Sequence, residues 1–287
     1  MFTCLSPGAI GVRVTNLKEA IEAARVGGFE GVEFNPFEVA DLEEKQGVDY
    51  VNSLFAHAAI RPGAFGLPVD WRGEEAKWRE GLAQLPRLAR AAAAIGCYRT
   101  ATWVPPASNE LTFLENWRFH VERFKPIAQI LADVGCSLGL EFIGPATSRR
   151  NYLYPFIYTM EKMLELAEAI GPNVGLLLDS WHWYTSGETV EGILKLRKKD
   201  VVYVHINDAP DGIPREKQID NRRALPGETG VIDIANFLRA LRHIGYDGPV
   251  TPEPFKAELA YLASDEERLR TVGAATRSVM HRAFGEE

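Results

Sequence analysis

Short apolar runs alternate with longer amphipathic segments along nearly the whole chain. The short runs have the length of buried strands, and the longer segments repeat apolar residues at helical spacing. The expected strands cover residues 9–14, 31–34, 60–67, 98–103, 137–142, 174–179, 201–206 and 249–254. The expected helices cover residues 16–28, 49–58, 74–96, 112–134, 156–170, 188–198, 231–245 and 265–283.

This alternation predicts one parallel sheet with helices on its outer face. Strands that are apolar throughout, rather than at every second position, are typical of strands buried on both faces. Eight strand–helix units in about 250 residues indicate a closed (β/α)8 TIM barrel in one domain, residues 1–287. The structural alternative is a doubly wound open sheet. It usually needs fewer strands, and no G-x-G-x-x-G motif follows the first expected strand.

Composition narrows the partners and the compartment. The chain has 287 residues and a formal net charge of −7, which argues against a nucleic-acid partner because such a partner requires a basic face. Three widely spaced cysteines form neither a disulfide framework nor a zinc knuckle, so we expect a reducing, cytoplasmic location. The N-terminus has no signal-peptide pattern and no apolar run reaches the length of a membrane span, so no membrane partner is expected.

Four expected strands end in, or lead into, a polar side chain. These residues are Glu141, Asp179, His205 and Glu253, and all four should point into the same mouth of the barrel. Any one carboxylate at such a place is as often a helix cap as a ligand. Three carboxylates and an imidazole held together would repel one another unless a cation lies between them. The set therefore predicts a divalent metal site, with Mn²⁺ as the first choice and Mg²⁺, Co²⁺, Zn²⁺ or Fe²⁺ as alternatives.

The strand ends also carry a family resemblance. The stretches LGLEF (138–142), LLLDSWH (176–182), VYVHINDA (202–209) and PEPF (252–255) resemble the xylose isomerase-like barrels. This superfamily contains sugar and sugar-phosphate isomerases and epimerases, inosose isomerases and dehydratases, and a branch of DNA-repair endonucleases. The resemblance implies that Glu141, Asp179, His205 and Glu253 are metal ligands. The D-x-x-H spacing of Asp179 and His182 looks like that of ketose 3-epimerases, which implies that His182 binds substrate beside the metal.

The resemblance implies a divalent-metal-dependent isomerase or epimerase that acts on a sugar, a sugar phosphate or a keto-polyol. Proton transfer would pass through a metal-stabilised enediolate, with Glu141 and Glu253 as the catalytic residues on opposite sides of the reacting carbon. Return of the proton to the opposite face gives epimerisation. Return to the neighbouring carbon gives aldose–ketose isomerisation.

The chain departs from the ketose 3-epimerase pattern in its substrate contacts. Those enzymes have a second glutamate shortly after the first ligand, where this chain has GPAT (144–147), and the arginine expected soon after His205 is displaced. Two long loops, residues 144–155 and 207–230, follow strands and supply arginines at the mouth. We expect Arg149 and Arg222 to bind an anionic or polyol group. A solvated loop face is the alternative for both.

Other candidate contacts lie at or near strand ends. Trp103 and Trp181 are expected to line the substrate pocket, although tryptophan is as often a core residue. Glu33 is expected to bind substrate hydroxyls, with a structural role as its alternative. His120 reads as a helix-surface residue.

Three other functions compete with an isomerase or epimerase. A lyase or dehydratase acting on a keto-sugar or keto-inositol would use the same chemistry but expel a leaving group. An apurinic-endonuclease-like repair enzyme needs many histidine and carboxylate ligands, whereas this chain has six histidines and several of them are expected away from the mouth. The net charge of −7 also argues against a DNA duplex as its partner. A non-catalytic barrel would bind a sugar without converting it. Relatives of this barrel are often homo-oligomers, so a homo-oligomer is also expected.

Overall fold

The strands form one parallel sheet that closes into a barrel. The computed structural model describes residues 1–285. The sheet has the strand order β3-β2-β1-β11-β10-β9-β7-β5-β4. Its strands are β1 (Phe2–Leu5), β2 (Gly31–Val32), β3 (Arg61–Pro62), β4 (Phe65–Gly66), β5 (Arg99–Val104), β7 (Ser137–Phe142), β9 (Val174–Asp179), β10 (Val201–Ile206) and β11 (Pro249–Pro252). The short strands β3 and β4 are consecutive in the chain and lie at the two ends of this order, so the segment 61–66 completes the ring and fills one of eight barrel positions.

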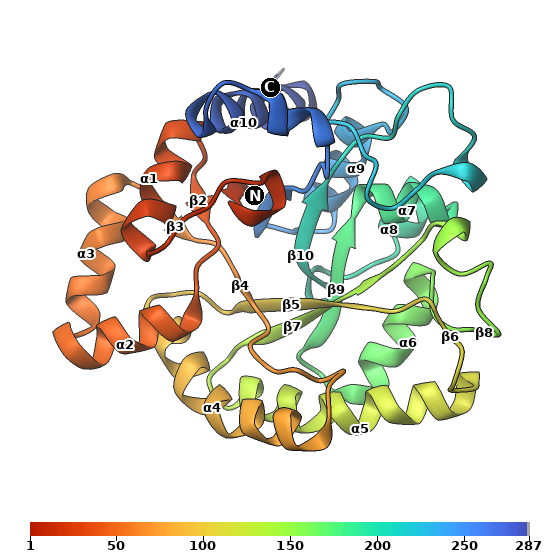
Figure 1. The fold of residues 1–287 in the computed structure, drawn as a ribbon, viewed down its shortest axis with the longest axis horizontal. Coiled ribbons are helices and arrows are strands. Elements are labelled where there is room, and N and C mark those ends of the chain that lie inside the picture. The colour runs from red at the N-terminus through yellow and green to blue at the C-terminus, as the bar shows by residue number, and fades with distance from the viewer. Residues whose placement is uncertain (286–287) are drawn as a thin grey trace.

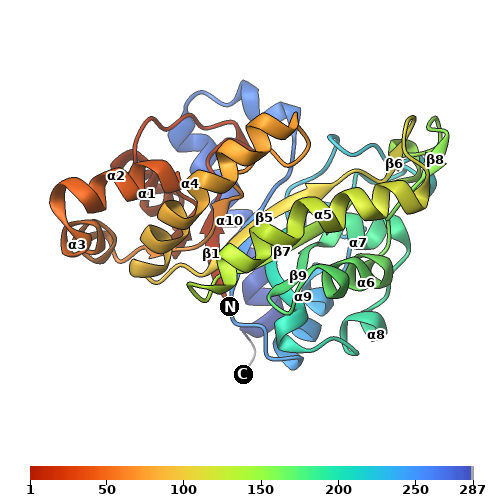
Figure 2. The same ribbon diagram turned by 90° about the horizontal axis from the view of Figure 1, so that it is seen from below.

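Within residues 1–285, ten α-helices surround the strands (Figure 1). They are α1 (Leu17–Gly27), α2 (Pro36–Gln46), α3 (Val48–Ala58), α4 (Glu75–Ala94), α5 (Phe113–Ala132), α6 (Met160–Ile170), α7 (Ser180–Ser186), α8 (Val190–Ile193), α9 (Ile234–His243) and α10 (Asp265–Phe284). A separate antiparallel pair, β6 (Ala107–Ser108) with β8 (Tyr154–Pro155), joins the loops that follow β5 and β7. This pair lies at the end of the molecule opposite the two termini (Figure 2).

The predicted strands 137–142, 174–179 and 201–206 are confirmed residue for residue as β7, β9 and β10. The first predicted strand, 9–14, is wrong, because this segment forms a 3-10 turn at Gly8–Ile10 followed by irregular chain. The first barrel strand is instead β1, whose four residues are all buried. The apolar residues Ile10 and Val12 are buried in the main core of the fold instead of pairing in the sheet.

The helices differ from the predictions in two places. Helix α2 begins at Pro36 directly after its cap Asn35 and was not expected. The helix expected over 188–198 is reduced to the four residues of α8, and α7 occupies the segment before it. Helix α7 begins there because the Asp179 carboxylate accepts hydrogen bonds from the first backbone N–H groups of the helix.

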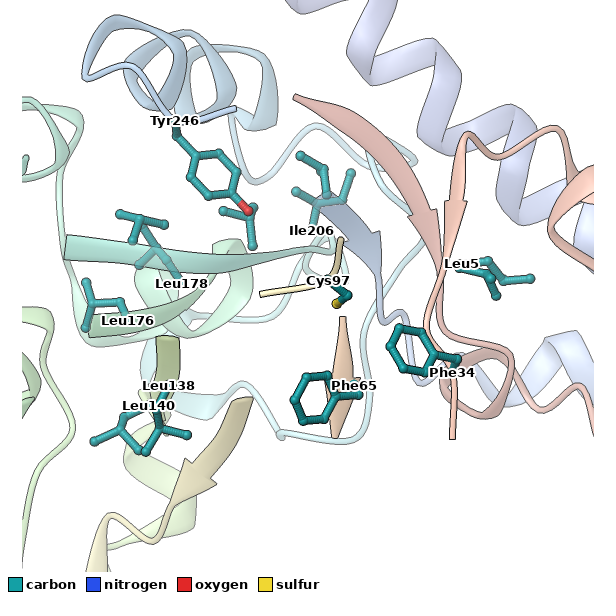
Figure 3. Close-up of a cluster of buried hydrophobic side chains, with 14 of the residues drawn as sticks. Leu5, Phe34, Phe65, Cys97, Leu138, Leu140, Leu176, Leu178, Ile206 and Tyr246 are labelled. Atoms are coloured by element: carbon teal, nitrogen blue, oxygen red, sulfur yellow. The ribbon is translucent and has the colours of Figure 1, made fainter. Parts of the chain in front are cut away.

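The barrel strands are lined differently on their two faces. Leu138, Leu140, Leu176 and Leu178 belong to the large core cluster of the fold (Figure 3). A small second cluster of Ala64, Leu177 and Tyr203, with Ala101 against it, fills the inside of the barrel. Side chains alternate along a strand, so the next inward position on each strand lies two residues further on. Those positions carry Trp103, Asp179 and His205, and β7 adds Glu141 through its register with Trp103.

The structure describes no helix that is long and apolar enough to cross a membrane.

His120 is buried rather than on the helix surface. Its ring stacks on Phe156 and packs against Trp71, and its Nδ1–H donates to the Asn116 carbonyl at 2.7 Å. Its Nε2 has no partner among the described residues, so protonation would add an uncompensated buried charge. Burial accordingly lowers the pKa of His120 to about 4.

This shift predicts a specific acid sensitivity. The unfolded chain binds a proton at this histidine near pH 6.5, whereas the folded chain binds it only near pH 4, so stability falls as the pH drops through that window. Between pH 7 and pH 5 the wild type should lose about 2 kcal/mol more unfolding free energy than His120→Gln. Urea unfolding at both pH values measures this loss, with the exposed His243→Gln as matched control. Equal losses in wild type and His120→Gln would contradict the assignment.

Candidate active site

The four predicted ligands converge at one end of the barrel. One ligand atom from each of Glu141, Asp179, His205 and Glu253 lies within 4.8 Å of the others. Glu141 is on β7, Asp179 ends β9, His205 is on β10, and Glu253 directly follows β11. These four strands are consecutive in the sheet, and His205 pairs in register with Asp179, so their side chains share one face. The positions of the four residues therefore follow from strand register.

Several polar atoms in this cluster are buried without a hydrogen-bond partner. They include Glu141 Oε1 and both ring nitrogens of His205, counting all described residues. The Nδ1 atom of His205 lies 3.5 Å from Glu253 Oε2, 3.8 Å from Glu141 Oε1 and 3.9 Å from Asp179 Oδ2. Buried polar atoms normally have partners, so this concentration of unsatisfied donors and acceptors needs an explanation. Three carboxylates and one imidazole with free lone pairs fit a divalent cation.

The protonation states show how strongly these groups interact. Burial, and then the neighbouring Glu253 carboxylate, raise the pKa of Glu141 well above its usual range. Burial disfavours the imidazolium of His205, yet the Glu253, Glu141 and Asp179 carboxylates together outweigh this and raise the pKa of His205 to about 10. Burial also disfavours the Glu253 carboxylate, but His205 and Arg223 lower the pKa of Glu253 to about 2. Without another cation, the cluster thus retains protons that a bound metal ion would displace.

Asp179 links this cluster to the helix that follows it. Its Oδ1 accepts hydrogen bonds from the backbone N–H groups of Trp181 at 2.6 Å and His182 at 3.3 Å, so it caps α7. Its Oδ2 accepts from Asn207 Nδ2 and from Arg223 Nη1, both at 2.9 Å. One fully buried carboxylate therefore starts the helix that carries His182 and also faces the proposed metal.

His182 lies beside the cluster as a neutral imidazole. Its Nδ1 accepts a hydrogen bond from the Gly144 N–H at 3.2 Å, and its Nε2 lies 3.2 Å from Arg223 Nη2. Burial, and then the Arg223 charge, lower the pKa of His182 to about 3. Residue 144 must be glycine, because a Cβ there would lie 2.2 Å from the His182 carbonyl oxygen. This close approach accounts for the glycine that begins GPAT (144–147), the stretch in which this chain lacks the second glutamate of the ketose 3-epimerase pattern.

The arginine in the site is Arg223, not Arg222. Its guanidinium is buried and bonds Asp179 Oδ2 at 2.9 Å, Glu253 Oε2 at 3.1 Å and Asp220 Oδ1 at 2.8 Å. Arg222 is exposed. An isolated β-bridge joins Asp208 to Ala224, the residue that follows Arg223. Nothing in the sequence distinguishes the two adjacent arginines, so only the folded loop decides between them.

Sequence reasoning also missed Asn207. Its Nδ2 donates to Asp179 Oδ2, and its Oδ1 accepts from the Glu253 backbone N–H at 2.8 Å, so it holds two of the proposed ligands in place. The signal was available, because Asn207 lies two residues after His205 and shares its face of the strand.

The two predicted tryptophan walls have different surroundings. Trp103 is 44 % exposed and pairs in register with Glu141, so its ring lies at the rim of the mouth. Trp181 is fully buried. It packs edge-on to His182 at 5.4 Å between centroids, and the Arg223 guanidinium lies over its ring at 4.9 Å. Trp181 is therefore a support behind these two residues and offers no surface to a ligand.

Glu33 and Arg149 also support other residues. Glu33 accepts a hydrogen bond from the Tyr203 hydroxyl, which also bonds Thr251 Oγ1 at 2.6 Å beneath His205. Arg149 lies over the Tyr158 ring at 3.7 Å and donates to the Gly144 carbonyl at 2.6 Å. It thus stiffens the turn whose N–H orients His182. Direct substrate contact by Glu33 and Arg149 stays a prediction.

Comparison with known proteins identifies the family. The family described as xylose isomerase-like TIM barrel matches residues 21–275 of this chain. The chain belongs to this family. Among solved structures, a xylose isomerase domain protein from Alicyclobacillus acidocaldarius has 32% sequence identity and a TM-score of 0.83, with 98% of each chain covered. This member of the xylose isomerase-like family therefore shares its whole fold with that protein.

Curated relatives match over shorter stretches. The inosose isomerase of Bacillus velezensis is 33% identical over 128 residues, 44% of this chain and 45% of the relative. The ketose 3-epimerase of Arthrobacter globiformis is 31% identical over 94 residues, 33% of this chain and 28% of the relative. These alignments thus span less than half the length of the curated relatives.

Proposed function

We propose that this protein is a divalent-metal-dependent isomerase or epimerase acting on a sugar, sugar phosphate or keto-polyol. The observation that carries the proposal is the cluster of Glu141, Asp179, His205 and Glu253, whose ligand atoms lie within 4.8 Å and include unsatisfied buried atoms. Glu141 is on β7 and Glu253 follows β11, and these two strands lie on either side of β9 and β10. The two glutamates therefore flank Asp179 and His205. This arrangement suits a reaction that needs one base on either side of a carbon atom.

The named residues divide the chemistry between them. Glu141, Asp179, His205 and Glu253 would hold the cation, which supplies Lewis acidity toward a carbonyl and a neighbouring hydroxyl group. Glu141 removes a proton from the carbon beside the carbonyl, and Glu253 returns one, or the reverse. The neutral His182 imidazole and the Arg223 guanidinium orient the substrate oxygen atoms and oppose the negative charge that develops on them. Return of the proton to the other face of the same carbon gives an epimer, and return to the adjacent carbon gives an isomer.

The relatives support this reaction class. Inosose isomerase and ketose 3-epimerase are both enzymes that, by their names, rearrange polyhydroxy ketones. A solved IOLI protein with a bound zinc atom has the same fold, with a TM-score of 0.77 at 23% identity. We expect Mn²⁺ as the working ion.

Solvent-deuterium incorporation tests the proposal. Protein loaded with Mn²⁺ in D₂O is expected to introduce one deuterium into at least one member of a panel of ketoses, keto-inositols and sugar phosphates, as measured by mass spectrometry and NMR. Removal of the metal with a chelator should stop incorporation, and restoring Mn²⁺ should recover it. A product lighter by one water would identify a dehydratase instead. A metal-loaded protein that binds these compounds and exchanges no proton would be a binding barrel and would contradict the proposed activity.

A further inference from the structure

A second arginine lies at the rim of the barrel mouth without a carboxylate partner. Arg72 follows β4, the strand beside β5 in the barrel. Its guanidinium lies 4.1 Å from the centroid of the Trp103 ring and 4.6 Å from that of Trp71. Its Nη1 donates to the Trp103 carbonyl oxygen at 3.3 Å. The cation thus contacts two indole rings, and its remaining N–H groups have no hydrogen-bond acceptor among the described residues.

The position of Trp103 brings this cation to the proposed active site. Trp103 pairs in register with Glu141 across β5 and β7, so both side chains point to the mouth. Trp71 is buried and donates from its Nε1 to Thr102 Oγ1 at 3.2 Å, which anchors the far side of the stack. The Arg72 guanidinium therefore contacts Trp103, which in turn is the neighbour of the proposed catalytic residue Glu141 across the two strands.

Arg72 is distinguished by its position at the mouth and by its contacts with two indole rings, because other arginines without an ion pair among the described residues, such as Arg123, also lie over aromatic rings. Arg223 contacts three carboxylates, and surface arginines such as Arg87 and Arg197 form ion pairs. No described carboxylate lies within ion-pair distance of Arg72, and the neighbouring Asp70 carboxylate accepts a hydrogen bond from the Gly73 N–H. Arg72 is exposed overall, and the partial burial of its guanidinium lowers the pKa of Arg72, with Asp70 opposing this shift. A guanidinium that is stacked in place with unused donors is well prepared to receive an anion, because its side-chain freedom has already been restricted.

We propose that Arg72 binds an anionic group on the substrate, a phosphate or a carboxylate, at the end remote from the reacting carbon. This inference rests on the proposed function and narrows it to acidic sugars or polyols. Trp103 would cover the apolar face of the carbon chain between the two ends. Arg72 is then a specificity-determining residue, and the three carboxylates of the cluster at the opposite end disfavour binding in the reverse orientation.

Matched polyols without a carbonyl group test this anion site independently of catalysis. The metal-loaded full-length protein is titrated with glucitol, glucitol 6-phosphate and gluconate by calorimetry. The wild type should bind at least one of the two anionic compounds about tenfold more tightly than glucitol, as expected for one charge-assisted bidentate pair. The phosphate and carboxylate arms show which anion the site prefers. Arg72→Met should remove most of this preference, and Arg72→Lys should restore part of it.

Arg61→Met is the matched control. Arg61 also stacks on an aromatic ring, that of Phe2, but it begins β3 at the opposite end of the barrel, and its loss should leave the preference unchanged. Equal affinities for the three compounds in the wild type would overturn the proposal, as would a preference that survives in Arg72→Met. Equal weakening of all three compounds by Arg72→Met would also overturn it, since that result assigns Arg72 only to the support of Trp103. Deuterium exchange by the wild type across the whole panel, neutral and anionic, reports on the proposed function separately, because it measures proton transfer and not the preference for an anion.

Discussion

Glu141→Gln is expected to lower deuterium exchange into a bound ketose by about 10²–10⁴-fold, the usual contribution of a positioned general base. Glutamine keeps the length of the side chain and one oxygen atom that can face the cation, but it cannot accept the substrate proton. Exchange is measured at saturating Mn²⁺ by the NMR signal of the exchanging carbon-bound hydrogen. The expected loss is large because, within the group of four ligand residues, Glu141 is the one carboxylate that β7 supplies.

Glu141 is both a proposed base and a proposed ligand, so the metal content must be measured with the rate. The variant should be assayed at a Mn²⁺ concentration at which its metal occupancy equals that of the wild type. Glu168→Gln, a change on the outer surface of α6, is the matched control and should keep the wild-type rate. Full exchange by Glu141→Gln at equal occupancy would remove Glu141 from the mechanism.

Arg223→Met is expected to destabilise the metal-free protein by about 3–5 kcal/mol, the usual cost of removing one partner from a buried ion pair. Arg223 is buried, and its loss leaves the buried Asp179 carboxylate and the partly buried Glu253 carboxylate without their shared guanidinium. Urea unfolding in the presence of a chelator measures this loss. A bound divalent cation supplies positive charge to the same oxygen atoms, so Mn²⁺ should stabilise Arg223→Met more than it stabilises the wild type.

The adjacent residue provides the control for this prediction. Arg222→Met changes the same chemical group on the same loop, but Arg222 is exposed, so its effect should stay within about 0.5 kcal/mol. Equal effects of the two substitutions would show that the loop does not hold Arg223 in the cluster. A smaller response of Arg223→Met to Mn²⁺ than that of the wild type would show that Arg223 organises the ligands more than it neutralises them.

The sequence predicted the barrel strands best where a strand is buried on both faces and is therefore apolar along its whole length. Strands β7, β9 and β10 agree with the expected residues because each is an apolar run between polar or glycine-containing segments, a pattern that suits a strand covered on both faces. The same runs located Glu141, Asp179 and His205, since strand register then brings the polar ends together. The first strand was misplaced because 9–14 is as apolar as 2–5, and local pattern alone does not show which of the two pairs with its neighbours.

Residues in loops could not be assigned in this way. Asp179 both ends a strand and starts α7, and this second role turned the following segment into a helix that buries Trp181. The selection of Arg223 over Arg222 depends on the folded loop, in which a bridge joins Asp208 to Ala224, sixteen positions apart in the chain. The cap at Asp179 had a local signal, because aspartate is a common N-cap residue. The choice of Arg223 had none, because it depends on contacts made after the loop has folded over the mouth.

The amino-acid sequence by itself determined the barrel, the mouth at which polar side chains gather and the residues of the proposed metal site. These follow from periodicity and from the parallel alignment of strand ends, which are properties of local chain geometry. Only the tertiary structure decided which arginine enters the cluster, which tryptophan stays at the rim, and that Arg72 lies stacked there without a carboxylate. Those outcomes depend on side chains that are distant in sequence and meet only when the loops pack together, so their burial and pairing energies arise in the folded state alone.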